Sequence, residues 1–369
     1  MKFKLNMKPM ILLAALGLAL LGIENPISLN TQQRTKLMEL IKTDKDAKAR
    51  FETLKRAADK AISDKPNPIR VIQGEGKLKT DPLAIKTRES LGDMRKMYFF
   101  AYTFAATGDT QYADKAREFI LAWSQQNTPT GNPIDETTLD DLFLAFDLTQ
   151  SQFSPAEKKS AQTWIRKVAD TQIAIGLIHA KKGDGISKNN WQSHRLKIVG
   201  LIGYTLSEKK YIDYAVEGFK RQIEVNLRPD GSSIDFHERD ALHYHCYDVE
   251  PLLELAIAAN NNGTNLYTYK SKSGASLEKS VKFLLPFCSG EKKHPEFVKS
   301  TVAFDRKRAE SGDENYKAGH LFDPKKGGHT LELAAAFDKN LSEVYCQATS
   351  RAASIYPSWQ FVINAARDK

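Results

Sequence analysis

Two short segments of the chain, 189–195 (NNWQSHR) and 238–251 (ERDALHYHCYDVEP), concentrate amide, guanidinium, imidazole and phenol groups. Amide, imidazole and guanidinium groups can bind and neutralise a carboxylate, and a tyrosine can move a proton at the carbon beside it. Such a site suits β-elimination from a uronic acid polymer, in which C5 loses its proton and O4 departs. The two segments are therefore the first candidate for an active site.

The catalytic residues that we predict are Asn190, His194, Arg239 and Tyr244. Asn190 and His194 lie four positions apart on the helix expected to begin at the asparagine pair, so both can address one carboxylate. Arg239 adds a permanent charge with a two-pronged donor geometry. Tyr244 is then the base that takes the C5 proton and the acid that returns it to O4, because a nearby cation lowers the pKa of a tyrosine from about 10.

Other residues of the same segments are expected to contact the substrate: Asn189, Trp191, Arg195, His243, His245 and Tyr247. Each residue type also has a structural interpretation, in which asparagines cap a helix, aromatic rings pack in the core and charged side chains face solvent. Tyr247 is an alternative to Tyr244 as the base.

His237, His243 and His245 suggest a metal site, because imidazole is a common zinc ligand. In a helix, residues 243 and 245 point to different sides, and an extended segment would need a further ligand from elsewhere. We therefore expect no catalytic metal and no cofactor. Paired carboxylates would suit a glycoside hydrolase, but the adjacent residues at 135–136 and 140–141 diverge by ~100° on a helix.

The candidate groups must be positioned by the secondary structure of the chain. Most of the sequence has the periodicity of helices, and patterns typical of strands are few. Apolar residues recur three and four apart in segments 37–41, 97–104, 116–123, 139–148, 198–204 and 252–259. Ser154, followed by Pro155 and Glu157, predicts a helix start, and Ser276 predicts another. The patterns at 331–337 and 341–355 extend the helical prediction to the C-terminal region.

A weak internal repeat indicates how these helices are arranged. The pattern D-x-x-Y-x-D-x-A begins at Asp109 and is echoed by E-x-x-Y-x-D-x-A from Glu208, each time after an apolar helix and a turn. Repeated helical hairpins stack into a solenoid or close into an α/α toroid. We predict an all-α fold, an incomplete toroid of helical hairpins, in one domain over residues 26–369. Segments 64–82, 127–133 and 311–328, rich in Pro and Gly, are lids over a groove or mobile surface loops.

The N-terminal segment carries Lys2, Lys4 and Lys8 before an apolar run at 10–23, which is too short to span a bilayer comfortably and typical of a signal peptide. We predict a signal peptide over residues 1–25 and a periplasmic or secreted protein with no membrane association after its removal. The three cysteines have no C-x-x-C spacing and allow one disulfide at most.

Composition and charge narrow the range of partners. The 369 residues are 41% hydrophobic and 27% charged, as in a soluble globular protein. Without the three lysines of the predicted signal peptide, the formal charge of +9 becomes +6. This charge permits an acidic polysaccharide as ligand. The basic residues form no Lys/Arg run of the kind typical of nucleic-acid binding, so we expect no nucleic-acid partner.

The order of these motifs resembles the alginate lyase superfamily of helical polysaccharide lyases. In that superfamily an Asn-Asn(-His) helix start precedes a Leu-x-Tyr-His-x-Tyr segment and an apolar, Pro-containing helix. The resemblance covers residues 73–259, and its earlier part includes the loop at 75–78 and the helical pair at 99–123. It implies a toroid lyase acting on alginate or a related polyuronate.

The resemblance also places the family's functional residues at Asn190, His194, Arg239 and Tyr244. Trp191 is a departure, because the family's histidine usually follows the asparagine pair directly and here comes a turn later. The alternatives that remain open are a glucuronan-type lyase of the same fold, a helical-toroid glycoside hydrolase, and an exported polysaccharide-binding protein without catalysis.

Overall fold

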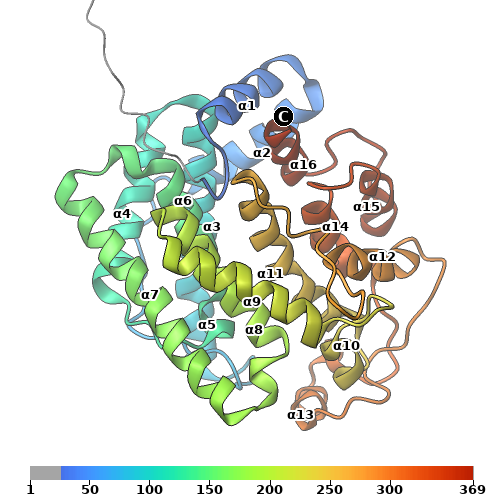
Figure 1. Cartoon of the computed structure of the whole chain (residues 1–369). Helices are drawn as coiled ribbons and strands as arrows, with labels where there is room; N and C mark the ends of the chain where they lie inside the picture. The colour runs from blue at the N-terminus through green and yellow to red at the C-terminus, as the bar shows by residue number, and fades with distance from the viewer. Residues whose placement is uncertain (1–25, 369) are drawn as a thin grey trace, which may run out of the picture.

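The computed structural model describes residues 26–368, which form helices joined by turns and loops (Figure 1). No strand occurs among the described residues, where only two isolated β-bridges pair extended segments. The all-α prediction is therefore confirmed. The predicted signal peptide falls outside the described part of the chain. None of the described helices is both long and apolar enough to cross a membrane.

The helices of the first half are α1 (Thr31–Thr43), α2 (Lys45–Ala61), α3 (Pro82–Thr107), α4 (Thr110–Gln126), α5 (Pro133–Glu136), α6 (Asp140–Thr149) and α7 (Pro155–Lys182). The second half contains α8 (Asn190–Leu206), α9 (Lys209–Asn226), α10 (Ile234–Arg239), α11 (Leu242–Asn261), α12 (Leu277–Cys288), α13 (Ala303–Glu310), α14 (Gly328–Ala334), α15 (Leu341–Thr349) and α16 (Trp359–Arg367). Short 3₁₀ turns, among them η1 (Thr137–Leu139) and η5 (Pro324–Gly327), connect some of them.

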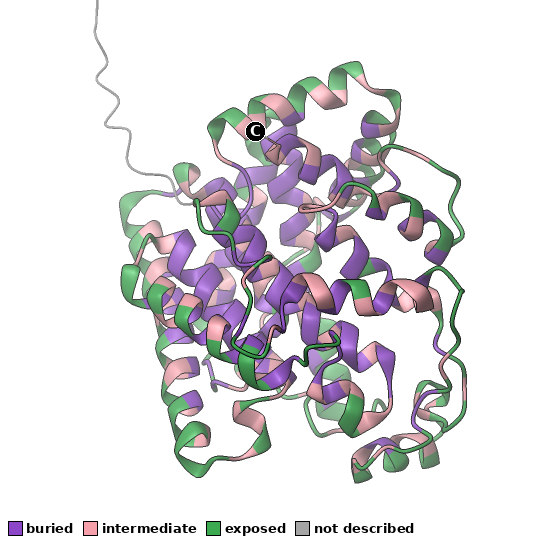
Figure 2. Cartoon of the chain, turned by 45° about the vertical axis from the view of Figure 1, so that its right-hand side comes forward, coloured by how far each residue is buried: buried purple, intermediate pink, exposed green. Residues whose placement is uncertain are grey.

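An inner ring of helices forms the core. Helix α3 packs on α6, α6 on α8, α8 on α11, and α11 on α14, while α16 and α1 bring the ring back to α3. The outer helices α2, α4, α7, α9, α12 and α15 cover this ring, and the buried residues concentrate on the inner helices (Figure 2). The predicted α/α toroid is confirmed.

Close packing between the layers depends on small residues of α8. A Cβ atom at Gly200 would lie 2.4 Å from the Leu255 Cδ1 atom of α11 and 2.9 Å from the Ala215 Cβ atom of α9. Glycine therefore lets α8 approach both neighbours, which no larger side chain would allow without movement.

The internal repeat corresponds to equivalent positions in two helical hairpins, α3–α4 and α8–α9. Tyr112 of α4 donates a hydrogen bond to Asp59 of the outer helix α2. Tyr211 of α9 donates in the same way to Asp170 of the outer helix α7, at 2.6 Å. The repeated tyrosine thus joins each outer helix to the preceding one.

Local sequence signals correctly predicted the starts of α7 and α12. Ser154 and Glu157 form a capping box at the start of α7. The Ser276 side chain accepts a hydrogen bond from the Lys279 backbone N–H at the start of α12. The expected helix at 341–355 is shorter than predicted, because α15 ends at Thr349 and Ser350 adopts a left-handed conformation with a φ of 55°. All three cysteines are buried and unpaired.

Candidate active site

A cavity of about 690 Å³ lies at the N-terminal ends of the inner helices α3, α8 and α11. The first turns of these helices line it, together with α10, α13 and the loops at 74–80 and 311–313. The N-terminus of a helix carries a partial positive charge and free backbone N–H groups. Three such ends converge on one cavity, where their first N–H groups are already bound by Asp81 at α3, Asp235 at α8 and Glu296 at α11. The positive charge offered to an anionic ligand therefore comes from the side chains.

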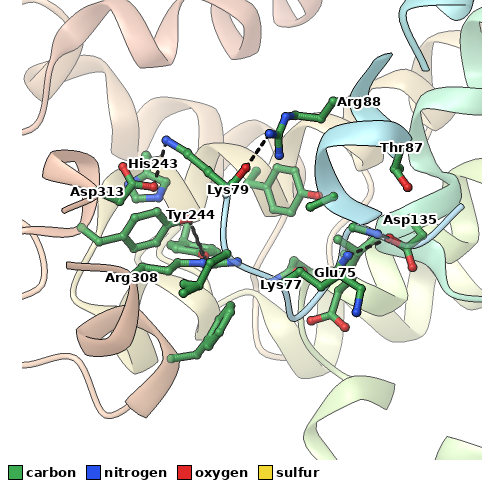
Figure 3. Close-up of a pocket in the computed structure, with 18 of the residues that line it drawn as sticks. Glu75, Lys77, Lys79, Thr87, Arg88, Asp135, His243, Tyr244, Arg308 and Asp313 are labelled. Carbon is green, nitrogen blue, oxygen red and sulfur yellow. Dashed lines mark hydrogen bonds and ion pairs between the residues drawn. The ribbon is translucent and has the colours of Figure 1, made fainter. Parts of the chain in front are cut away.

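The charged residues that line the cavity are more often basic than acidic. The basic residues are Lys77, Lys79, Arg88, Arg239, Arg308 and Lys326, and the acidic residues are Glu75, Asp135, Glu250 and Asp313. Asp135 accepts hydrogen bonds from the backbone N–H groups of Gly74 at 2.7 Å and Glu75 at 2.8 Å (Figure 3). The lining thus carries six basic and four acidic side chains, and Asp135 is held in place by the backbone.

Tyr244 lies in this cavity between two guanidinium groups. Arg308 Nη1 donates a hydrogen bond to Tyr244 Oη at 2.8 Å (Figure 3). Tyr316 Oη lies 3.2 Å from the same oxygen. The Arg239 guanidinium lies over the Tyr244 ring at 3.9 Å from its centroid, and Asp305 holds it there through an ion pair. Both cations are placed where they stabilise negative charge on the Tyr244 oxygen.

Asn190 and Trp191 line the cavity from the first turn of α8. Asn189 precedes them as the helix cap, since its side chain accepts a hydrogen bond from the Trp191 backbone N–H. Asp235 accepts hydrogen bonds from both the backbone and the side chain of Asn190. Burial raises the pKa of Asp235 to about 6, although these hydrogen bonds oppose the shift. The asparagine is therefore held in one orientation at the cavity wall.

His194 does not line the cavity. Its ring is buried one turn further along α8, where Nδ1 lies 2.7 Å from Thr137 Oγ1 and the ring packs against Tyr247. Burial and the nearby Lys197 hold the pKa of His194 well below its usual range. Only the first turn of α8 reaches the cavity, so the His194 ring is enclosed behind it. A neutral imidazole in that place does not supply the positive charge that the sequence assigned to it.

We expect His194→Ala to act on stability more than on turnover. Loss of the buried ring should lower the free energy of unfolding by about 2–4 kcal/mol, while kcat changes by less than about tenfold. Denaturant unfolding and initial rates measure the two effects. A rate loss of roughly 10²–10³ with unchanged stability would instead show that His194 acts on the substrate.

Arg195 and His245 are fully buried away from the cavity, so neither contacts a substrate there as the sequence suggested. Arg195 packs against Gly176 of α7, where a Cβ atom would lie 2.7 Å from Arg195 Cδ. His245 Nδ1 lies 3.1 Å from Ser233 Oγ, and its Nε2 lies 3.0 Å from the Ser280 carbonyl oxygen. Successive residues diverge around a helix, so His243 faces the cavity while His245 faces α12.

The histidines near α11 do not converge on a metal. His237 Nε2 pairs with Ser232 Oγ at 2.7 Å, and the two neighbours of Tyr244 point to different sides. Within residues 26–368 no three His, Cys, Asp or Glu side chains are grouped as metal ligands.

Two of the three segments predicted as lids or mobile loops line the cavity. An ion pair of 2.8 Å between Lys79 Nζ and Asp313 Oδ2 joins the loop before α3 to the loop after α13 (Figure 3). Arg88 donates to the Lys79 carbonyl oxygen at 2.6 Å. The third segment, 127–133, instead packs on α7, where Trp164 Nε1 donates to the Asn127 carbonyl oxygen.

Sequence reasoning missed Arg308 and Tyr316, which both contact the Tyr244 hydroxyl. They lie 64 and 72 positions from Tyr244 in the sequence, in a charged segment with weak helical periodicity. No local spacing rule connects residues so far apart, and only the folding of α13 over the N-terminus of α11 brings them together.

Comparison with known structures agrees with this architecture. An alginate lyase from Bacteroides ovatus superposes with a TM-score of 0.64 at 17% identity, covering 92% of this chain and 98% of that chain. Alginate lyase A1-III from Sphingomonas species A1 superposes with a TM-score of 0.61 at 16% identity, covering 86% and 88%. A tyrosine-to-phenylalanine variant of A1-III, complexed with tetrasaccharide, superposes with a TM-score of 0.61 at 17% identity, covering 86% and 89%.

At these identities the superpositions establish the fold alone. No curated protein matches the sequence significantly. The family model described as alginate lyase matches residues 37–294, which run from the middle of α1 to just beyond α12 and therefore include most of the ring and the cavity wall. The chain thus belongs to the alginate lyase family.

Proposed function

We propose that this protein is a polysaccharide lyase that cleaves alginate or a related polyuronate by β-elimination. The observation that carries the proposal is the Tyr244 hydroxyl, which lies in a cavity at three helix N-termini with Arg308 bonded to its oxygen and Arg239 over its ring. The cavity offers positive charge for the uronate carboxylate and an oxygen for proton transfer. A variant of alginate lyase A1-III, of the same fold, is complexed with a tetrasaccharide, which supports a saccharide ligand.

The proposed reaction needs a single proton-transfer group. The ionised Tyr244 oxygen takes the proton from C5, and the resulting electron pair forms the C4–C5 double bond as the C4–O4 bond breaks. The phenol then gives the same proton to the departing O4, which regenerates the ionised tyrosine. Arg239, Arg308 and Asn190 stabilise the negative charge on the tyrosine and on the substrate's carboxylate.

Glycoside hydrolysis is a second candidate, because Glu75 and Asp135 line the same cavity. Burial, followed by the neighbouring Asp135, raises the pKa of Glu75, as a general acid requires. Asp135 is already bound by two backbone N–H groups, which weakens its case as the partner base. The doublets considered from the sequence do not provide two carboxylates in the cavity, since neither Glu136 nor Asp140 lines it.

Incubation with alginate, glucuronan and pectate tests these two functions directly. A lyase creates a conjugated C4–C5 double bond, so ultraviolet absorbance should rise together with the number of chain ends. A hydrolase would release reducing ends without absorbance, and that result would overturn the proposed elimination. Binding without either product would identify a polysaccharide-binding protein.

Salt should weaken substrate affinity more than turnover. A polyanion held by the basic side chains of the cavity is screened over a Debye length of about 8 Å at physiological ionic strength. We expect the KM for polyuronate to rise steadily between low and high NaCl while kcat changes little, as measured by initial rates at several concentrations. A KM independent of salt would mean that the basic lining does not bind the polymer.

We further propose that the protein is exported to the periplasm or secreted, on the basis of the basic and apolar pattern of residues 1–25. Cell fractionation and N-terminal sequencing of the mature protein test this proposal. An intact N-terminus in the cytoplasmic fraction would contradict it.

A further inference from the structure

His243 is the only histidine among the residues that line the cavity. Trp191 follows the asparagine pair of α8, and the ring of His194 is enclosed between η1 and α11. The His243 and Tyr244 rings lie with their centroids 4.6 Å apart, so both can reach one sugar unit. An imidazole is therefore present beside the proposed base, but it comes from α11 and not from α8.

Glu296, in the segment between α12 and α13, binds His243 at two points. Its Oε1 atom accepts the His243 backbone N–H at 2.9 Å, and its Oε2 atom lies 3.2 Å from His243 Nδ1. The Glu296 side chain is fully buried. Its backbone is fixed as well, because its N–H donates to the His320 carbonyl oxygen and its carbonyl accepts from Gly319. The carboxylate thus has a defined position relative to the imidazole.

The surroundings of Glu296 keep it ionised. His320 Nδ1 lies 2.6 Å from the Lys317 carbonyl oxygen, and its Nε2 lies 3.1 Å from Glu296 Oε2. Lys326 Nζ lies 3.9 Å from the same Glu296 oxygen. Burial alone would raise the pKa of Glu296, but His243 and Lys326 hold it below its ordinary value.

An ionised Glu296 determines the protonation pattern of His243. The carboxylate can only accept, so Nδ1 of His243 carries a proton and donates it to Glu296. The second ring nitrogen, Nε2, makes no hydrogen bond to any described residue, and the side chain keeps 18% of its surface exposed in the cavity wall. A carboxylate behind an imidazole also stabilises the doubly protonated, cationic ring.

We propose that Glu296 is a positioning residue that holds His243 as an imidazolium, whose Nε2–H binds and neutralises the carboxylate of the sugar that undergoes elimination. The proposal rests on the proposed lyase function. In α8 the residue after the asparagine pair is Trp191, which has no imidazole, and we assign the imidazole that binds the carboxylate to His243 of α11. His243 touches the substrate, whereas Glu296 acts through His243.

A double-mutant cycle tests this dyad. We expect His243→Gln to lower kcat/KM by roughly 10²–10³-fold, and Glu296→Gln to lower it by roughly 10²-fold. The double variant should be no slower than His243→Gln alone, because Glu296 acts on the reaction through His243. Additive losses would overturn the proposal.

The pH profile separates positioning from a merely structural role. The titratable or charged groups packed against this pair are Tyr244 and Tyr316 beside His243, and His320 and Lys326 beside Glu296. Glu296→Gln removes the negative charge that favours the imidazolium, so the alkaline limb of kcat/KM should move to lower pH. Glu136→Gln is the matched control, because Glu136 is equally buried but is bonded to the 130–131 turn and Gln172 outside the cavity. Glu136→Gln should lower the stability of the fold without shifting the alkaline limb of kcat/KM.

The titration of the His243 ring by NMR tests the dyad without any reliance on turnover. In Glu296→Gln the ring should take up its proton at lower pH than in the parent protein, whereas Glu136→Gln should leave it unchanged. An unaltered titration in Glu296→Gln would overturn the dyad even if elimination is observed. If no polyuronate undergoes elimination but the His243 titration is shifted in Glu296→Gln, the proposed lyase function would be wrong. The coupling between Glu296 and His243 would still hold.

Discussion

Replacing Tyr244 with phenylalanine is expected to lower kcat by roughly 10³-fold or more, since general acid–base groups commonly contribute 10²–10⁴-fold. The change removes one oxygen and leaves the ring beneath Arg239, so the fold and most ground-state contacts remain. Substrate affinity should therefore stay within several-fold of the parent protein. Initial rates of double-bond formation and equilibrium binding to the inactive variant measure the two quantities.

Tyr247→Phe is the matched control for this experiment. Tyr247 also lines the cavity, one helical turn along α11, but burial raises its pKa far above the ordinary value despite the opposing effect of Lys197. A hydroxyl that resists ionisation is a poor base, so this variant should keep most of its activity. If Tyr247→Phe were the inactive variant and Tyr244→Phe the active one, the base would be Tyr247 and the proposed assignment would be wrong.

Replacing Arg308 with methionine is expected to lower kcat by roughly 10²–10³-fold, the usual loss when one preorganised donor to a developing charge is removed. Arg308 donates to both Tyr244 and Tyr316, so its loss leaves the tyrosine oxygen without its hydrogen-bonded cation. The pH–rate profile should also change, because the tyrosine oxygen loses its nearest positive charge. Initial rates across the alkaline range measure both effects.

Two further substitutions make the Arg308 experiment specific. Arg306→Met removes the same type of side chain from the same helix, but Arg306 is exposed and bonded to the Ser300 carbonyl oxygen, so its activity should be unchanged. Arg308→Lys keeps the charge without the planar donor group and should recover part of the rate. Equal losses in Arg306→Met and Arg308→Met would point to the stability of α13 and not to contact with Tyr244.

The candidate site was only partly visible in the sequence. Asn190, Trp191, Arg239, His243, Tyr244 and Tyr247 line the cavity, whereas Asn189, His194, Arg195 and His245 do not. Helix geometry explains the division within α11, because His243 and His245 cannot face the same side. Helix geometry does not explain the division within α8. Asn190 and His194 share a face of that helix, but only its first turn reaches the cavity.

By itself, the sequence determined the features that depend on neighbouring residues. The capping box of Ser154 and Glu157 and the start of α8 after Asn189 follow from hydrogen bonds to the nearest backbone N–H groups. The helical fold follows from the spacing of apolar residues, and the repeated hairpin follows from the pattern that begins at Asp109 and Glu208.

Only the tertiary structure decided which side chains meet at Tyr244. Arg308 and Glu296 come from segments that lie far along the chain, and they reach the N-terminus of α11 because the chain after α12 folds back over it. Burial also had to be known before charge could be assigned, since the same imidazole group is neutral at the enclosed His194 and exposed to the cavity at His243. Contact order and desolvation are properties of the folded chain, and no spacing of residues in the sequence specifies them.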